Sequence, residues 1–206
     1  MWGLQFLDDF ILGTPYKLIL KRYLLYLKNQ KFQPSDASAI LKAALIRTPR
    51  SGKIIIRDVR VADRFIEFDL STCDQEIQVV IKALSSIGDL DNFEMLKEDN
   101  FSKEEAIDKA RDLFNEERFW KCHEILENIW KQSEGEEKRL LNGVILVAAA
   151  FVHFQKGENE TCIGILRRAF DKIKLSRGEY HGIKLDLLLE NLRNIIDTGI
   201  IVRLRL

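Results

Sequence analysis

The repeat of apolar residues changes its period near residue 98 of this 206-residue chain. Before that point, runs rich in β-branched and aromatic residues alternate with helical stretches; after it, apolar residues recur every three to four positions almost to the end. A chain of this length has room for one large or two small domains. We therefore expect an α+β protein with a small α/β domain at 1–98, a helical bundle at 99–199 and a strand-like tail at 200–206.

The first segment contains patterns for four strands and two helices. Ser35 or Asp36 is the expected N-cap of the first helix. The resulting order β-α-β-β-α-β is that of a ferredoxin-like split βαβ sandwich, with a helix at 22–29 as the alternative for the first strand. The strands are expected at 22–29, 53–59, 64–70 and 92–98, and the helices at 34–48 and 74–88.

The second segment has clearer boundaries. In SKEE (102–105) the Ser102 hydroxyl is expected to accept from a free backbone N–H while Glu105 reaches back, which is a capping box. Short connections make neighbouring helices antiparallel, so we predict an antiparallel all-α helical bundle. The alternating tail IIVRLRL is expected to cover a sheet edge or to pair with another chain. The helices are expected at 103–114, 117–132, 137–156, 159–175 and 183–197.

Composition narrows the class of protein. The 32 basic and 32 acidic residues balance, as is typical of a soluble globular chain. The N-terminus MWGLQFLDDFIL lacks the positive region of a signal peptide, and the longest apolar run, GVILVAAAFV, is about half a membrane span, so no membrane partner is expected. The three cysteines lack CxxC spacing, which favours the cytoplasm. The excess of Ile, Leu, Lys and Glu is thermophile-like.

The stretch RFWKCHEILENIW (118–130) places polar residues at the edge of an apolar helical face. Because successive helical residues turn by about 100°, His123, Glu127 and Trp130 share one side of the helix. An unpaired buried carboxylate is costly, so His123 is the expected partner of Glu127. We expect the three side chains to project together into a shielded crevice between helices.

The third predicted helix carries a second histidine after its apolar run. Gly143 and the Ala148–Ala150 triplet have little side-chain bulk, which lets a neighbouring helix approach closely. If this helix packs antiparallel to the previous one, His153 lies near the start of that helix. His123 and His153 would then share a pocket with Glu127.

The pattern FN-x3-F-x3-HE-x-LE-x2-W, followed by G-x4-AAA-x2-H-x3-G, resembles that of domain of unknown function 309, the HxxxExxW family. The resemblance covers roughly residues 103–175 and implies an all-helical fold without an established activity. Many members carry Gln where this chain has Leu146, which removes one polar group from the predicted pocket. The motif and pocket residues that we single out are His123, Glu124, Glu127, Trp130, Gly143 and His153.

These patterns favour a non-enzymatic binding or scaffolding protein that self-associates as a homo-oligomer. The His-Glu-Trp cluster would be mainly architectural, would line a pocket for a small molecule and would need no cofactor. One alternative is a metal-assisted hydrolase in which His123, Glu127 and His153 bind the ion, because two imidazoles and a carboxylate are a common ligand set for zinc and iron. Glu127 would be its base.

A second alternative is an RNA-binding protein. Residues 17–60 carry an excess of about nine positive charges, and a ferredoxin-like sheet with a basic side is typical of RNA-recognition modules. Against this, Glu67 and Asp69 beside Phe65 would repel phosphates, and no RNP-like signature is present. Nucleic acid is therefore the less favoured partner.

Overall fold

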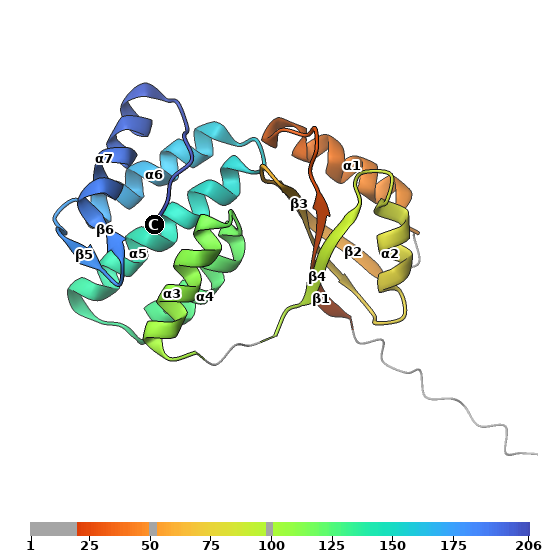
Figure 1. Ribbon diagram of the computed structural model, residues 1–206, viewed down its shortest axis with the longest axis horizontal. Coiled ribbons are helices and arrows are strands. Elements are labelled where there is room, and N and C mark those ends of the chain that lie inside the picture. The colour runs from red at the N-terminus through yellow and green to blue at the C-terminus, as the bar shows by residue number, and fades with distance from the viewer. Residues whose placement is uncertain (1–19, 50–52, 98–100) are drawn as a thin grey trace, which may run out of the picture.

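A four-stranded antiparallel sheet precedes a helical region in the computed structural model (Figure 1), which describes residues 20–49, 53–97 and 101–206. The predicted α+β class is confirmed. The apolar N-terminal stretch that we tested for a signal peptide lies outside the described residues.

The N-terminal region has the predicted order of elements, and the run at 22–29 is a strand rather than a helix. Each neighbouring pair of strands is antiparallel, and the order across the sheet is β2-β3-β1-β4. This is a ferredoxin-like split βαβ arrangement. The elements are β1 (Lys21–Lys28), the 3-10 turn η1 (Pro34–Asp36), α1 (Ala37–Arg47), β2 (Ile54–Val61), β3 (Phe65–Thr72), α2 (Ile77–Leu84) and β4 (Leu90–Met95).

Alternation along the strands gives the sheet two different faces. Apolar residues such as Leu25 of β1 and Phe68 of β3 join the core that includes buried residues of α1 and α2, which lie on one face in Figure 1. The other face carries Arg60, Glu67 and Asp69, all of which are buried. Every residue of β3 is buried, so both faces of the sheet are covered along this strand, whereas the edge strand β4 is largely exposed.

The first helix begins differently from the prediction. Pro34 opens a short 3-10 turn, and α1 starts only after Asp36, whose side chain makes no cap hydrogen bond to that helix. Instead, the Asp36 carboxylate accepts from the backbone N–H of Gln33 at 2.8 Å. Asp36 thus occupies the predicted N-cap position of α1, but its carboxylate caps the preceding turn.

The helical region matches the predicted order, with one unpredicted hairpin. The capping box is confirmed: Ser102 Oγ accepts from the Glu105 N–H at 3.4 Å, and Glu105 Oε2 accepts from the Ser102 N–H at 3.0 Å. No helix in the described ranges is both long and apolar enough to cross a bilayer. The elements are α3 (Lys103–Asn115), α4 (Phe119–Gln132), α5 (Gly135–Phe154), α6 (Asn159–Ile173), β5 (Glu179–Tyr180), β6 (Ile183–Lys184) and α7 (Leu185–Thr198).

Gly143 allows α5 and α6 to approach closely. A Cβ atom added at this position would lie 2.3 Å from Cγ2 of Ile173 and 3.2 Å from Cβ of Lys172, both on α6. Real carbon atoms need about 3.5–4.0 Å. The glycine is therefore explained by helix packing.

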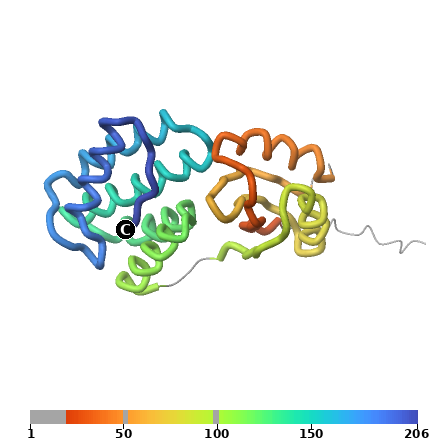
Figure 2. Tube along the Cα trace, turned by 45° about the horizontal axis from the view of Figure 1, so that its top comes forward, coloured from red at the N-terminus to blue at the C-terminus, as the bar shows by residue number. Residues whose placement is uncertain are grey.

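The C-terminal tail forms no strand, contrary to the prediction, and it does not lie along the sheet edge. It runs back across the helical region in both views (Figures 1 and 2). Leu204 is buried in the helical core. The side chain of Asn115 donates to the Leu206 carbonyl at 3.1 Å and accepts from its N–H at 3.0 Å. The alternation of apolar and polar residues in the tail thus reflects a segment that packs one of its sides against the helices.

Candidate functional site

Helix α4 carries the motif, and aromatic packing at its start fixes its position. The ring of Phe119 lies 4.8 Å from that of Phe114 at the end of α3 and 5.0 Å from that of Phe151 on α5. Offset and edge-to-face aromatic pairs of this spacing stabilise beyond their buried area. They orient α4, and with it the motif side chains one and two turns later.

His123, Glu124 and Glu127 converge on one side of α4. One potential ligand atom from each lies within 4.8 Å of the other two, and no other group of three such side chains comes this close in residues 20–49, 53–97 and 101–206. His123 Nδ1 lies 3.5 Å from Glu124 Oε1, and Glu127 Oε2 lies 3.8 Å from Nζ of Lys131. The partner of His123 is thus Glu124, whereas the sequence pattern predicted Glu127.

The cluster is half-exposed and does not lie in a shielded crevice, which corrects the expected geometry. The side chains of His123, Glu124 and Glu127 are 25%, 45% and 38% exposed. The helical period placed them correctly at the flank of the buried stripe. The neighbouring helices α3 and α5 cover the stripe itself and leave this flank open to solvent.

Glu124 is held in its ionised form. Hydrogen bonding to His123 lowers the pKa of the Glu124 carboxyl against the opposing effect of burial, and the charges of His123, Arg22 and Lys131 lower it further. A carboxylate with a depressed pKa is a charged acceptor at neutral pH and a poor general acid.

Trp130 packs partly against the helical core. The ammonium group of Lys138 lies over its ring, 5.0 Å from the centroid. Such a cation–π contact contributes about 0.5–1 kcal/mol at an exposed site. It links the end of α4 to the first turns of α5.

His153 does not join the cluster. Since Phe119 at the start of α4 faces Phe151 on the antiparallel α5, His153 lies beyond the first turn of α4. Its Nδ1 atom pairs instead with the carboxylate of Glu158. The structure therefore does not assemble the His123, Glu127 and His153 set on which the hydrolase alternative depends.

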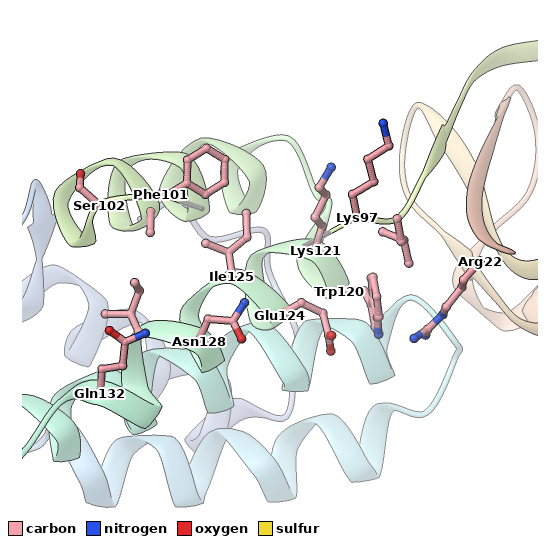
Figure 3. Close-up of a pocket in the computed structure, with 13 residues that line it drawn as sticks. Arg22, Lys97, Phe101, Ser102, Trp120, Lys121, Glu124, Ile125, Asn128 and Gln132 are labelled. Atoms are coloured by element: carbon pink, nitrogen blue, oxygen red, sulfur yellow. The ribbon is translucent and has the colours of Figure 1, made fainter. Parts of the chain in front are cut away.

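A pocket of about 690 Å³ lies beside the motif, between α4, the segment that leads into α3, and β1 (Figure 3). Trp120 and Arg22 lie at one end, Asn128 and Gln132 lie toward the other, and Glu124 lies between them. Glu124 thus belongs both to the pocket and to the His123 cluster. The pocket is built by both regions of the chain.

Trp120 joins the helical region to the sheet. The guanidinium carbon of Arg22 lies 4.5 Å from the centroid of its ring, and that of Arg60 lies 5.3 Å away. Arg22 is held by two bonds to the Asp69 carboxylate, at 2.8 and 2.6 Å. Trp120 was not among the expected site residues, because a tryptophan next to an apolar stripe is usually a packing residue.

Arg60 lies at the centre of a buried charge network on the same sheet face. Only 2% of its side chain is exposed. Its Nε donates a hydrogen bond to the carboxylate of Glu67, which lies opposite on β3. Asp58 lies 3.4 Å and Asp69 3.7 Å from its other nitrogens. The acidic residues that we expected to repel phosphates instead bind arginines. This face is covered by the helical region and does not offer bases a stacking surface.

Glu117, in the turn between α3 and α4, was also missed. Its backbone is left-handed, with φ of 66°, which is uncommon for a residue other than glycine. Its carbonyl accepts from Nε2 of Gln155 at 2.8 Å, and its carboxylate accepts from the Asp63 N–H at 2.9 Å and pairs with Nε of Arg203 at 3.0 Å. Burial raises its pKa. Glu117 thus ties the tail and the β2–β3 turn to the helices.

Comparisons with known proteins find similarity over part of the chain. An uncharacterized protein of Aquifex aeolicus (strain VF5) is 26% identical over 95 residues, which are 46% of this chain and 28% of that protein. This chain therefore matches just over a quarter of that relative's length.

A conserved hypothetical protein from Thermus thermophilus, known from its crystal structure, is 31% identical; the match covers 44% of this chain and 95% of that one, with a TM-score of 0.39. Residues 107–165 match the family described as domain of unknown function (DUF309). This segment contains the His123 cluster, Trp130, Gly143 and His153. Residues 107–165, within the helical region, are thus a segment of the DUF309 type.

Proposed function

We propose that this protein is a non-enzymatic binding protein that holds a small molecule in the pocket between α4 and β1. The observation that carries the proposal is that the two regions of the chain together line a cavity of about 690 Å³. Pockets that bury most of a small organic ligand have volumes of about 300–1,000 Å³. A ligand here would contact both regions at once and stabilise their arrangement.

The lining suits an amphipathic molecule. Trp120 and Phe101 supply aromatic surface, while Asn128 and Gln132 supply amide donors and acceptors. Glu124 adds a carboxylate whose depressed pKa keeps it charged. Apolar walls with a few placed polar groups are the usual composition of ligand sites.

The test uses 1-anilinonaphthalene-8-sulfonate, an aromatic anion that fluoresces when it enters an apolar site. We expect saturable binding of one dye molecule per chain. Asn128→Trp fills the pocket from an exposed position on α4 and should abolish this binding. The matched control is Asn194→Trp, which makes the same change at an exposed position on α7, away from the pocket.

Two results would contradict the proposal. One is the absence of saturable dye binding by the wild-type protein. The other is equal binding by Asn128→Trp and by the α7 control. Because partly unfolded states also bind this dye, each variant must show the cooperative urea transition of the wild-type protein before its binding is compared.

Self-association, which the sequence analysis favours, stays a prediction within this proposal. Ile46, Leu175 and Ile200 expose large apolar side chains, at 78%, 71% and 65%, and are the positions at which a contact with a second copy would bury most apolar area per residue. Sedimentation velocity over a range of protein concentrations tests it. A sedimentation coefficient that stays at the value of a single chain would contradict self-association.

A further inference from the structure

We propose that His123, Glu124 and Glu127 bind one divalent transition-metal ion at the rim of the pocket. The proposal deepens the binding function above, on which it rests in one respect: the ion's remaining coordination positions would face the same small-molecule site. The helical motif would then supply the ligands, and the pocket would supply the space for what the ion binds.

The spacing of the donor atoms fits one ion. Metal–nitrogen and metal–oxygen bonds of zinc are about 2.0–2.2 Å long, so two donors on one ion lie no more than about 4.4 Å apart. The three donor atoms here already lie within 4.8 Å of one another. Both carboxylates are half-exposed, so a small change of their side-chain torsions, within the space that solvent occupies, would close the set.

The charges also fit. A neutral imidazole and two carboxylates carry two negative charges, which a divalent cation neutralises. This donor set, with one nitrogen and carboxylate oxygens but no thiolate, suits zinc, iron and manganese. Cys122 is adjacent to His123 in sequence but fully buried in the helical core, so it adds no sulfur ligand.

The cation now nearest to the cluster is a weak competitor. Nζ of Lys131 lies 3.8 Å from Glu127 Oε2, which is longer than a hydrogen bond, and its side chain is 60% exposed. Exposed ion pairs of this kind contribute little to stability. A metal ion with direct bonds to Glu127 would displace the ammonium group into solvent at little cost.

The position of Glu124 defines the class of molecule that would complete the site. Its side chain lines the pocket, while His123 holds it from the other side (Figure 3 shows Glu124 between the two ends of the pocket). Three protein ligands leave at least one position of a tetrahedral or octahedral ion open. A small molecule with a carboxylate, phosphate or hydroxyl oxygen would bind there.

The experiment is equilibrium dialysis of chelator-treated, full-length protein against Zn²⁺ and Mn²⁺, with the bound metal measured by elemental analysis. We expect one zinc ion per chain. His123→Gln and Glu127→Gln should each weaken zinc binding at least tenfold, since even residues that only support a ligand change metal affinity 10- to 100-fold. Both positions are half-exposed, so the variants should fold normally, which circular dichroism checks.

Two further variants separate this site from surface binding. His153→Gln removes the other half-exposed His–Glu pair, with Glu158, and should leave zinc affinity unchanged. Lys131→Met removes the competing ammonium and should tighten zinc binding, a gain that a merely structural cluster would not produce. The absence of stoichiometric zinc, an unchanged affinity in Lys131→Met, or an equal loss in His153→Gln would overturn the proposal.

Dye binding in the presence of EDTA distinguishes the two proposals. Retained dye binding by a protein that fails to bind zinc overturns the metal site and leaves the pocket in place. Zinc binding by a protein without a dye site overturns the small-molecule proposal and supports the metal site alone.

Discussion

Replacing Gly143 by alanine tests whether the close approach of α5 and α6 determines this glycine. The new Cβ would lie 2.3 Å from Cγ2 of Ile173, where about 3.5–4.0 Å is needed. Ile173 is fully buried, and its Cγ2 is bonded directly to Cβ, so it cannot turn away freely. Lys172 Cβ at 3.2 Å blocks movement along α6.

The expected magnitude combines two opposing effects. Overpacking of a buried interface costs about 1–3 kcal/mol. Alanine in place of glycine within a helix gains about 0.8–1.0 kcal/mol. Gly164→Ala is the matched control, because a Cβ at that position of α6 meets nothing within 4 Å. The control should be stabilised by that gain alone, so the two variants should differ in unfolding free energy by about 1–3 kcal/mol.

Urea denaturation followed by circular dichroism measures this difference. In a chain of this size each kcal/mol shifts the melting temperature by about 2–4 °C. Ile173→Ala alone should cost about 2–5 kcal/mol, and combining it with Gly143→Ala should cost less than the sum of the two, since the clash has been removed. Equal stabilities of Gly143→Ala and Gly164→Ala would refute the packing argument.

Three other residues allow equally direct tests. Arg60→Met should lower the unfolding free energy by about 3–5 kcal/mol in urea titrations, because it leaves the buried Glu67 carboxylate without its partner. Burial raises the pKa of Glu117, so the native state binds this proton more tightly than the unfolded chain does. The wild-type protein should therefore gain stability over Glu117→Gln as the pH falls toward 4.5, and lose that gain as the pH rises through the raised pKa. Urea midpoints of the two proteins that stay the same distance apart across this range would contradict this prediction. Asn115→Ala removes two hydrogen bonds to Leu206, and hydrogen exchange should show faster exchange of the Leu206 amide.

The sheet and most helices could be predicted from the sequence because the patterns that indicate them are local. The run RFIEFDL alternates with period two, and the capping box at Ser102 marks a helix start within four residues. The tail IIVRLRL alternates as well, but its partner, Asn115, stands 91 residues earlier. Alternation shows that one side is buried and does not specify whether a strand or a helix buries it.

The candidate site could be predicted only in part, because only some of its geometry depends on local sequence patterns. Spacing on one helix correctly grouped His123 with Glu127, since i and i+4 share a face. Exposure of that face depends on where α3 and α5 pack, and the position of His153 depends on the register of two antiparallel helices. The contacts of Trp120 with Arg22 and Arg60 bring together residues 60 or more positions apart, which no local pattern encodes.

The mixed character of the contact between sheet and helices has a thermodynamic consequence. Hydration of polar groups lowers the heat capacity, whereas hydration of apolar groups raises it. Arg60 and Glu67 lie there beside Tyr26 and Phe65, whose rings meet edge to face at 5.3 Å. Separating the two regions would expose both kinds of surface, so it would raise the heat capacity by less than exposure of an equal, purely apolar area. The van 't Hoff plot of such an opening would therefore curve less than that of an apolar contact of the same size.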